Sequence, residues 1–550
     1  MRPLVLVALS LLSLSAWAQP PPCDSGSVFE DRNGNARRDH GEPGVLGVRV
    51  SDGVEIVTSD AQGRYTLPAV DGRTAFVIKP PGYTLPVRAN GMPDYWHNLR
   101  TAPGPALKYG GIPVAVPACR DFALRRATPS PNRQAALSVL LFADPQPKSM
   151  ADVGYYERDI IASAMQEGAI DMGHGFGKFH FLGGAADLGL SLGDIVHDDL
   201  ALYPALNAAT AKLGVPWLHV AGNHDLDFDA TRDEDSLLTF RHHYGPDTFA
   251  WEEPEATFIV LDDVVYLPGP SPDMIGGLRE AQFAFLERYL PTVPKERLLV
   301  IGVHVPFFDT APDRETFRKA DRARLFALLR PFPHVLLLSG HAHTQRHVFH
   351  GAASGWHGAN PLHEYNVGAA SGAFWSGAKD AAGIPDARMS DGTPNGYARL
   401  RVEAGGRYRL SWHPARLDAS DAARTAAMSL HAPKVLRRGA YPAFGVYANV
   451  YMGRDDSRVE FRVDEGPWQP MVRVERPDPG LLAENMRDDQ AERLRGYDRS
   501  PEAGRSRHLW RGVLPTDLAL GEHRIEVRAF DAWHGEQRAR TRYRLDDAKE

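Results

Sequence analysis

Five clusters of residues that commonly bind metal ions lie in the middle of the chain, and each directly follows a short apolar run. The apolar runs occupy residues 136–143, 188–192, 215–220, 298–303 and 335–339. The clusters after them read, in the same order, D-P-Q from 144, G-D-I-V-H-D from 193, G-N-H-D from 222, H-V-P from 304 and G-H-A-H from 340. Carboxylate, imidazole and amide groups are suitable ligands for divalent metals. One such cluster alone is typical of a turn or a buried histidine, but five in order predict a metal site.

The apolar runs have the length of buried β-strands, and helical patterns lie between them. In residues 278–290, apolar side chains recur at helical spacing between a Gly-Gly pair and Pro291. Strands that alternate with helices predict an α/β sheet. Because ligands in such sheets bind at the carboxyl ends of the strands, the five clusters are expected to lie close together.

The ordered clusters resemble the calcineurin-like metallophosphoesterase superfamily, whose pattern is D-x-[HQ], GD, GNH[DE], a lone H and GHxH. The resemblance covers about residues 136–415 and implies a four-layer αββα fold with two metal ions. It implies that one metal is held by Asp144, Gln146 and His343. It implies that the second is held by Asn223, His304 and His341. Asp194 would bridge both metals, and His224 would act as an acid or transition-state stabiliser instead of a ligand.

A two-metal site is well suited to the hydrolysis of a phosphoester. Divalent ions about 3.5–4 Å apart hold a phosphoryl group and lower the pKa of a shared water, so that it becomes hydroxide near neutral pH. His224 can then donate to the phosphoryl oxygens or to the leaving oxygen. The expected reaction is therefore hydrolysis by a metal-bridging hydroxide.

Three positions differ from the commonest forms of the pattern. Gln146 stands where histidine is usual, and its harder oxygen donor favours Mn²⁺ or an iron–zinc pair among the candidate ions Mn, Fe and Zn. His197 and Asp198 stand where the protein-phosphatase branch carries aspartate and then arginine. His197 resembles the residue that partners the catalytic histidine in nucleases and diesterases, and a surface histidine without a role is the open alternative. The Asp198 and Asp199 carboxylates should disfavour a monoester dianion relative to a diester.

The layout also resembles a secreted bacterial subfamily with dedicated N- and C-terminal β domains, in which two further segments recur after the G-H-A-H cluster. The first segment contains Trp375, and the second contains Asp391, Asn395 and Tyr397. The resemblance implies that these residues wall the substrate cleft. A tight hairpin with core aromatic side chains is the alternative.

Both ends of the chain have the short alternating runs and frequent turn residues of β domains. This pattern fills residues 26–124 and returns from about 433. We predict a leader at 1–18, an N-terminal β domain at 23–126, a catalytic domain at 136–415 and a C-terminal β domain at 430–550. The expected fold is a multidomain chain, with an α/β core of αββα type between two β-sandwich-like domains.

A sixth cluster lies in the predicted N-terminal β domain and has the spacing of a calcium-binding loop. Oxygen donors fall at positions 1, 3, 5, 9 and 12 of that loop: Asp31, Asn33, Asn35, Asp39 and Glu42. Ala36 stands at the position where such loops have glycine for a sharp turn. Calcium binding and an ordinary polar surface turn are both open interpretations.

The first residues have the order of a secretory leader: a basic residue, an apolar run at 4–14 and small residues around a cleavage site near Ala18. We expect export to the periplasm or the medium. In that oxidising compartment Cys23 and Cys119 would form a disulfide worth about 4 kcal/mol of loop entropy. Two separate buried thiols are the alternative.

Composition limits the class of protein. The chain has 550 residues, of which 43% are hydrophobic and 24% are charged, and we expect no transmembrane segment. Its net charge of −7 is unlike that of a nucleic-acid-binding protein, so we expect a phosphoester substrate and no stable nucleic-acid partner. The sequence predicts an exported enzyme that hydrolyses a phosphodiester or a phosphoanhydride. The alternatives are a phosphate-scavenging phosphomonoesterase and a calcium-stabilised adhesion protein on a phosphoesterase scaffold.

Overall fold

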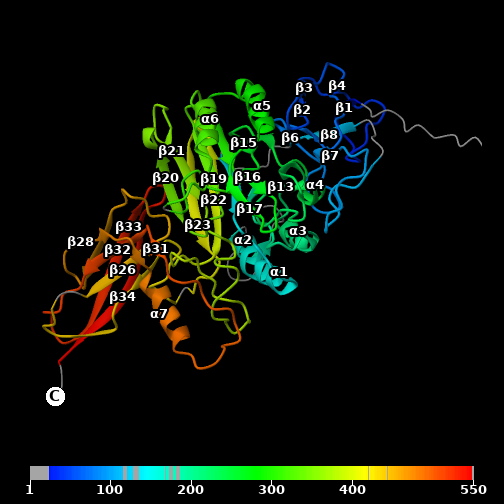
Figure 1. The fold of residues 1–550 in the computed structure, drawn as a ribbon. Coiled ribbons are helices and arrows are strands. Elements are labelled where there is room, and N and C mark those ends of the chain that lie inside the picture. The colour runs from blue at the N-terminus through cyan, green and yellow to red at the C-terminus, as the bar shows by residue number, and fades with distance from the viewer. Residues whose placement is uncertain are drawn as a thin grey trace, which may run out of the picture.

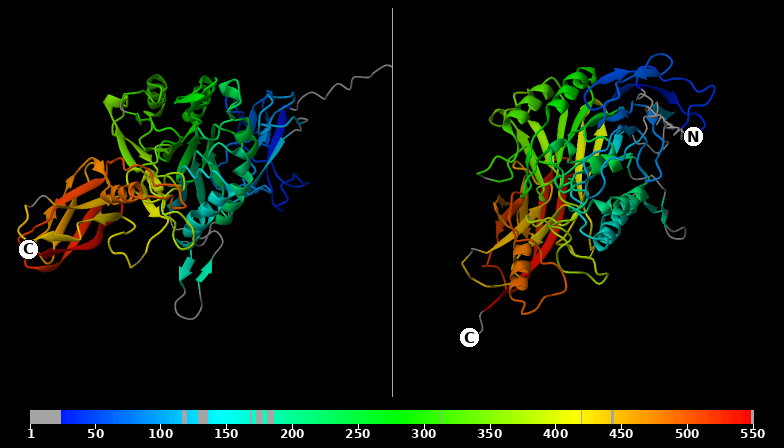
Figure 2. Two further views of the ribbon diagram at one scale, coloured as in Figure 1. Left: turned by 60° about the horizontal axis from the view of Figure 1, so that its bottom comes forward. Right: turned by 45° about the vertical axis from the view of Figure 1, so that its right-hand side comes forward.

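A central α/β region lies between two β-rich regions, one from each end of the chain (Figure 1). The two views of Figure 2 also place the N-terminal and C-terminal regions on opposite sides of the central one. The computed structural model describes residues 24–115, 120–127, 136–167, 169–171, 178–180, 186–311, 313–418, 420–441 and 444–547. The predicted leader and both cysteines, Cys23 and Cys119, lie outside the described residues.

The N-terminal region consists of two four-stranded sheets. The first has the order β4-β1-β8-β6 and the second the order β3-β2-β5-β7. Their strands are β1 (Ser25–Glu30), β2 (Arg49–Ser51), β3 (Ile56–Thr58), β4 (Arg64–Thr66), β5 (Thr74–Val77), β6 (Tyr83–Thr84), β7 (Trp96–Asn98) and β8 (Arg120–Arg126). The region is tied to the central one by ion pairs of Arg49 with Glu252 and of Lys79 with Glu253.

The central region contains two larger sheets. The first runs in the order β13 (Trp217–Val220), β12 (Leu188–Leu192), β9 (Ala136–Phe142), β22 (Gly396–Glu403) and β23 (Tyr408–Pro414). The second runs β14 (Phe249–Glu252), β15 (Ala256–Val260), β18 (Leu298–Gly302), β19 (Val335–Ser339), β21 (Leu362–Asn366) and β20 (Arg346–His350). β9, β12 and β13 are mutually parallel, and so are β15, β18, β19 and β21. Their carboxyl ends therefore meet at one edge of each sheet.

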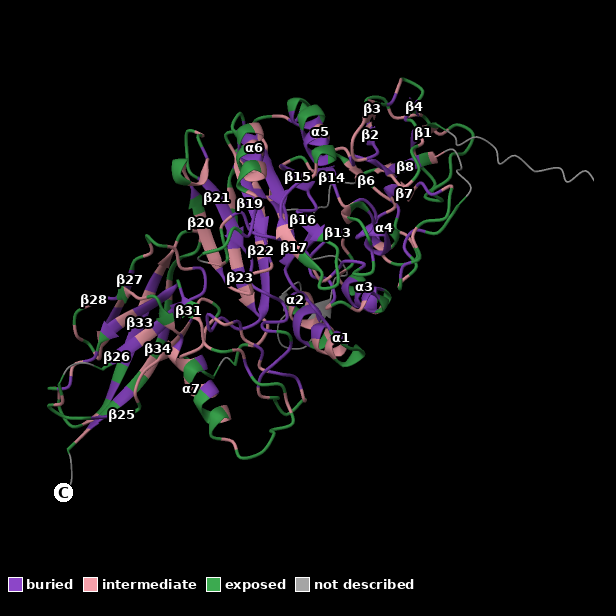
Figure 3. Ribbon diagram, viewed as in Figure 1, coloured by how far each residue is buried: buried purple, intermediate pink, exposed green. Residues whose placement is uncertain are grey.

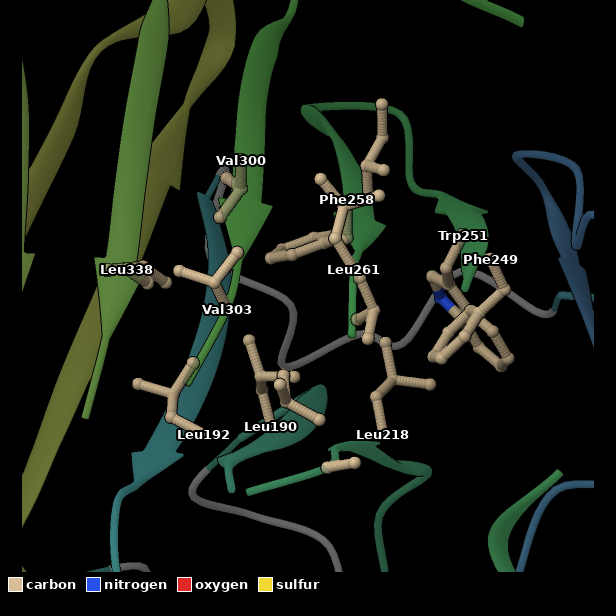
Figure 4. Packing of buried hydrophobic residues seen from close by; sticks show 14 of the residues in the cluster. Leu190, Leu192, Leu218, Phe249, Trp251, Phe258, Leu261, Val300, Val303 and Leu338 are labelled. Atoms are coloured by element: carbon tan, nitrogen blue, oxygen red, sulfur yellow. The ribbon is translucent and has the colours of Figure 1, made fainter. Parts of the chain in front are cut away.

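The two sheets pack face to face around the main hydrophobic core. A Cβ at Gly302 of β18 would lie 3.5 Å from Leu190 of β12 and 3.6 Å from Val220 of β13, so the sheets are in direct contact. Figure 4 shows side chains of both sheets, among them Leu190 and Val300, pointing into this interface. The central strands are buried along their whole length (Figure 3), which explains why they are continuous apolar runs in the sequence. Each buried leucine or valine there contributes about 1.5–3 kcal/mol.

Helices and short hairpins connect the strands. The helices are α1 (Met150–Tyr156), the π-helical turn η1 (Glu157–Ile161), α2 (Ala162–Glu167), α3 (Tyr203–Thr210), α4 (Leu238–Tyr244), α5 (Glu280–Tyr289) and α6 (Lys319–Leu329). Single 3₁₀ turns are η2 (Leu200–Leu202), η3 (Ala211–Leu213), η4 (Asp233–Asp235), η5 (Leu290–Thr292), η6 (Ala352–Ser354) and η7 (Ala404–Gly406). The hairpins are β10 (Ala169–Asp171) with β11 (Lys178–His180), and β16 (Val264–Leu267) with β17 (Asp273–Gly276). α5 occupies the segment where the apolar spacing predicts a helix.

The C-terminal region contains two larger sheets with the orders β24-β26-β32-β29 and β25-β34-β33-β27-β28, and a two-stranded sheet of β30 and β31. Its elements are β24 (Met428–His431), β25 (Val435–Arg437), β26 (Gly445–Val450), β27 (Val459–Val463), β28 (Gln469–Pro470), β29 (Val472–Arg473), β30 (Arg476–Pro477), α7 (Pro479–Asp489), β31 (Arg505–Ser506), β32 (Leu509–Val513), β33 (Gly521–Asp531) and β34 (Gly535–Asp546). Met428, Trp510 and Ile525 belong to a separate core between the sheets. Among the helices that the structure describes, none has the length and apolar character needed to cross a membrane.

Candidate metal centre

The five predicted clusters come together at the carboxyl ends of β9, β12, β13, β18 and β19. Ligand atoms of Asp144, Asp194 and His343 lie within 4.8 Å of one another, and so do those of Asp194, His304 and His341. Asp194 belongs to both groups, and the Gln146 amide donates to its Oδ2 at 2.7 Å. Asn223 Oδ1 lies 3.0 Å from His304 Nε2, so it joins the second group.

The loops that carry these residues turn sharply and use conformations that most side chains avoid. Asp144, Gln146, Asp194, His341 and His343 all have left-handed backbone, with φ between 39° and 68°. Such conformations cost about 1–3 kcal/mol each and are typical of functional sites. The glycines of two clusters are sterically required, because a Cβ at residue 193 would come 2.3 Å from His304 and one at residue 222 would come 2.1 Å from the Asp194 backbone.

In two imidazole rings a hydrogen bond from Nδ1 to a backbone carbonyl orients Nε2 toward the candidate centre. His304 Nδ1 donates to the Leu192 carbonyl at 2.8 Å, and His343 Nδ1 donates to the Gly372 carbonyl at 2.8 Å. Nε2 of each ring is therefore unprotonated in the neutral form and faces a carboxylate: Asp194 at 3.2 Å and Asp144 at 3.5 Å. This arrangement fixes the tautomer that a metal ligand needs.

The donor set fits two divalent cations. The Gln146 Oε1 atom is buried without a hydrogen-bond partner among the described residues, although its amide nitrogen is bonded. His341 Nδ1 lies 3.2 Å from His304 Nε2, so two ring nitrogens face the same point. Burial lowers the pKa of His304, but the Asp194 carboxylate outweighs this and raises it to about 10. The charge of Asp194 that favours a proton on His304 would equally favour a metal cation in its place.

Buried carboxylates that are not candidate ligands hold the loops in place. Asp225 accepts from the backbone amides of Ile195 and Gly222, and so joins the second and third clusters. Asp263 accepts from the backbone amides of His304 and Val305. Asp263 was not expected from the sequence, and its only signal is an Asp-Asp pair just after an apolar run.

Comparison with known proteins agrees with this geometry. Three family models match the chain: N terminal of Calcineurin-like phosphoesterase at residues 32–108, Calcineurin-like phosphoesterase at 138–345, and C terminal of Calcineurin-like phosphoesterase at 364–537. The chain belongs to the calcineurin-like phosphoesterases. It is a metal-dependent phosphoester hydrolase, and the family uses a dinuclear metal centre.

Solved structures with some likeness to this phosphoesterase include a dimetal phosphatase from Danio rerio, with 15% identity and a TM-score of 0.35 over 52% of this chain and 98% of that one. The purple acid phosphatase PPD1 from yellow lupin (Lupinus luteus) has 11% identity and a TM-score of 0.38, over 67% of this chain and 66% of that one. PhoD has 11% identity and a TM-score of 0.34, over 81% and 82%. No curated protein matches the chain.

His224 of the phosphoesterase is held by Asp198 and stacked against His197. His224 Nδ1 donates to Asp198 Oδ1 at 2.6 Å, and the His197 and His224 rings are stacked with centroids 4.4 Å apart. The sequence left His197 open as a partner of His224 or a surface histidine without a role; in the structure His197 contacts His224 by ring stacking, and the carboxylate of the next residue accepts its hydrogen bond. Burial lowers the pKa of His224, while the Asp198 hydrogen bond and the Asp194 charge raise it, and the net shift is upward.

The four residues expected to wall the substrate cleft are buried in the structure. Trp375 is 3% exposed, and its indole donates to the Pro145 carbonyl at 2.8 Å. Asp391 accepts from the Gln345 amide, Asn395 donates to Asp159, and Tyr397 lies in the main core. These side chains therefore support the loops behind the centre, because their polar atoms and rings face protein.

Phe374 is the exposed aromatic residue beside the candidate centre, where the sequence suggested Trp375. Its side chain is 37% exposed, and its ring centroid lies 4.8 Å from that of His343 and 5.5 Å from that of His197. The Lys148 ammonium lies over this ring, 4.9 Å from its centroid. Phe374 and Trp375 both have left-handed backbone, which turns one ring outward and buries the other. Lys148 was also missed, although it follows the first cluster by two residues.

The candidate calcium loop is satisfied by its own hydrogen bonds. Asp39 Oδ2 accepts from the side-chain amides of Asn33 and Asn35, both at 2.7 Å. Glu42 accepts from the backbone amides of residues 32 and 39, and Asp31 pairs with Arg125 at 3.2 Å. Ala36 adopts the left-handed conformation, with φ 59°. The five oxygen-bearing residues share one loop, and calcium binding there stays a prediction.

Proposed function

We propose that this phosphoesterase hydrolyses phosphodiesters or phosphoanhydrides at the centre around Asp194. The observation that carries the proposal is that the two groups of ligand atoms share this one carboxylate. In the proposed assignment one metal is held by Asp144, Gln146 and His343, and the other by Asn223, His304 and His341, with Asp194 between them. The ions are drawn from Mn, Fe and Zn, because the donors are mixed nitrogen and oxygen atoms.

The chain positions the reactants and moves one proton. When bound, the two metals supply hydroxide at neutral pH and hold the phosphoryl oxygens. Since His224 Nδ1 is engaged by Asp198, Nε2 is the nitrogen left to donate a proton to the leaving oxygen. The raised pKa of His224 keeps that proton on the ring to higher pH. His197 stacks on the same ring and limits its rotation.

The preference for a diester rests on the leaving group and on the surroundings of the centre. An alkoxide leaving group needs a proton donor, which His224 supplies. Asp198 carries a carboxylate where the protein-phosphatase branch has arginine, so the second charge of a monoester dianion lacks that partner. The exposed Phe374 ring beside His343 offers an apolar face to the second ester group of a diester.

The test compares bis(p-nitrophenyl) phosphate with p-nitrophenyl phosphate on the mature protein supplied with Mn²⁺. We expect a higher kcat/KM for the diester. We also expect Phe374→Ala to raise KM for the diester by about 2–10-fold, the effect of losing one aromatic contact. The control Trp375→Phe changes the buried neighbour: it removes the indole hydrogen bond to Pro145 and some buried ring volume, and it leaves the exposed Phe374 ring in place. A tenfold preference for the monoester across several leaving groups would overturn the proposal and favour phosphate scavenging.

The proposal also covers export of the protein, the boundaries of its domains and the four-layer fold of the catalytic domain. The sequence of residues 1–18 supports cleavage near Ala18 and a periplasmic or secreted enzyme. The family model at 32–108 supports the N-terminal domain at 23–126. The pairing of β22 with β9 supports a catalytic domain of αββα type at 136–415, and the separate C-terminal core supports a domain at 430–550. N-terminal sequencing of the mature protein tests the cleavage site. Mass spectrometry without reductant tests a bridge between Cys23 and Cys119.

A further inference from the structure

A cavity of about 750 Å³ lies between the N-terminal region and the central region, away from the metal centre. The N-terminal region contributes residues 52–54, 70–73, 100 and 103–105 to its wall. The central region contributes residues from η4, α4 and α5 and the segment at 247–248. None of the proposed metal ligands lines it. Its volume lies in the range that small-molecule sites occupy.

The Arg100 guanidinium forms part of this wall, and among the residues that the structure describes it makes no hydrogen bond and no ion pair. Arg100 is 9% exposed, and its Nε atom is buried without a hydrogen bond. Within the described residues no carboxylate lies within ion-pair distance of this guanidinium, and no acceptor lies within hydrogen-bond distance. The Asp71 carboxylate on the same wall accepts instead from the backbone and hydroxyl of Thr101. Nε is therefore a buried donor without an acceptor, while the two Nη atoms are not fully buried, so an anion in the cavity can reach a charged donor group.

The other arginines of the wall are all engaged. Arg73 pairs with Asp52 at 2.6 Å, Arg232 pairs with Asp235 at 2.6 Å, and Arg279 pairs with two carboxylates. Arg241 donates to the Gly72 carbonyl at 2.7 Å and to Thr74 Oγ1 at 2.9 Å. Arg100 is therefore exceptional on this wall, and a general excess of positive charge does not explain it.

The Arg100 guanidinium lies beside two glycines. A Cβ at Gly104 would come 2.1 Å from Arg100 Nη2, and a Cβ at Gly72 would come 3.8 Å from Nη1. Larger residues at 104 would displace the group from the wall. The planar fork of a guanidinium matches the two oxygens of a phosphate group.

We propose that this cavity binds a small phosphate compound, with the phosphate group on Arg100. The compound is either free phosphate or a phosphorylated molecule with hydroxyl groups. The acceptors for those hydroxyl groups are on the same wall, at Asp235, Asp247 and Thr248. The site is independent of the hydrolytic reaction, and it links the two regions because each supplies part of its wall.

Calorimetric titration of the metal-loaded protein tests this assignment. Inorganic phosphate is one probe, and a hydroxyalkyl phosphonate, which has no ester bond to cut, is the other. We expect wild type to bind phosphate at two sites, the metal centre and the cavity. Arg100→Gln should weaken the cavity site at least about tenfold, as expected for loss of a charged hydrogen-bond pair. Arg232→Gln, which changes a paired arginine of the same wall, should keep both sites, and kcat should be unchanged in both variants.

Thermal unfolding separates ligand binding from a structural role. Without phosphate, Arg100→Gln should unfold at about the same temperature as wild type, because Arg100 makes no hydrogen bond or ion pair with a described residue. Added phosphate should raise the midpoint of wild type and change that of the variant much less. If Arg100→Gln does not fold, Arg100→Lys takes its place in the test, because it keeps the charge and loses the planar guanidinium fork. Arg100→Lys should bind phosphate with an affinity between those of wild type and Arg100→Gln.

The two probes also identify the source of the phosphate. Tighter binding of the phosphonate indicates a phosphorylated molecule, and equal or weaker binding indicates free phosphate. Two phosphate sites in both Arg100 variants, with wild-type affinities, would overturn the proposal. So would an equal loss of binding in Arg232→Gln, or a site that takes dicarboxylates and not phosphate.

Discussion

Asp198 controls the orientation of His224, and Asp198→Asn measures how much that orientation matters. The two side chains share a hydrogen bond of 2.6 Å between His224 Nδ1 and Asp198 Oδ1. Asparagine keeps the shape and one acceptor oxygen but removes the negative charge. The hydrogen bond then becomes a neutral one, which is about half as strong.

The size of the effect follows from the exposure of the pair. A hydrogen bond to a charged group contributes about 1.5–3 kcal/mol. The Asp198 side chain is 49% exposed, so solvent screens part of this. We expect a loss of about 1–2 kcal/mol in transition-state stabilisation, which is about 5–30-fold in kcat. The loss should be larger for diesters with alkyl leaving groups than for p-nitrophenyl esters, because only a poor leaving group needs a proton.

The pH profile gives a second readout with a definite sign. The Asp198 hydrogen bond is one of the interactions that raise the pKa of His224. In the proposed mechanism the protonated ring is the active form. Without the carboxylate the ring loses its proton at lower pH. The alkaline limb of kcat should therefore move to lower pH in Asp198→Asn.

The assay is steady-state kinetics over a series of leaving groups, with metal content measured on the same samples. Asp199→Asn is the matched control, because the Asp199 carboxylate accepts from the Tyr109 hydroxyl and from the Ala201 amide of η2 and not from His224. We expect it to leave kcat within about twofold of wild type, since surface changes of this kind are nearly neutral. Equal losses for good and poor leaving groups in Asp198→Asn would refute a role through proton donation.

Three further changes test the centre and its supports. Asp194→Asn should lower the occupancy of both metals, measured by elemental analysis, and reduce the rate of diester hydrolysis by orders of magnitude. Native metal content in this variant would contradict the assignment of Asp194 as a ligand of both metals. His224→Ala should keep both metals and slow turnover by about 10²–10⁴-fold, and metal loss there would show that it is a ligand. His508→Ala should weaken metal binding by about 10-fold or more with the fold retained, because it removes the ring that hydrogen-bonds the Asp391 carboxylate. Arg505→Ala, a change at a nearby exposed residue, is its control.

The position of the candidate centre could be predicted because buried parallel strands leave a clear trace in sequence. β12 and β18 are covered on both faces, so each is a continuous apolar run. The first polar residues after each run, such as Asp194 and His304, then mark the edge of the sheet. Glycines 193 and 222 add information, because only glycine fits beside the neighbouring cluster.

Contacts between distant residues could not be predicted in this way. Sequence does not show that Asp198 meets His224, since 26 positions separate them and a sharp turn at each decides the contact. The choice between Phe374 and Trp375 depends on two successive left-handed residues, which a bulky aromatic residue rarely adopts and which no pattern signals. Trp375 was the more conspicuous residue in the sequence, but its indole ring is buried.

The C-terminal region supports the metal centre through one buried carboxylate. Asp391 Oδ2 accepts from the backbone amide of Gln345, two residues after His343, and from the His508 ring at 3.0 Å. The Asp391 carbonyl also accepts from Asn449 of β26 at 2.8 Å. All of these groups are buried, so an unpaired Asp391 would be costly. The position of the loop that carries His341 and His343 therefore depends on contacts with the C-terminal region, which explains why a β-rich region can matter to a centre to which it contributes no candidate ligand.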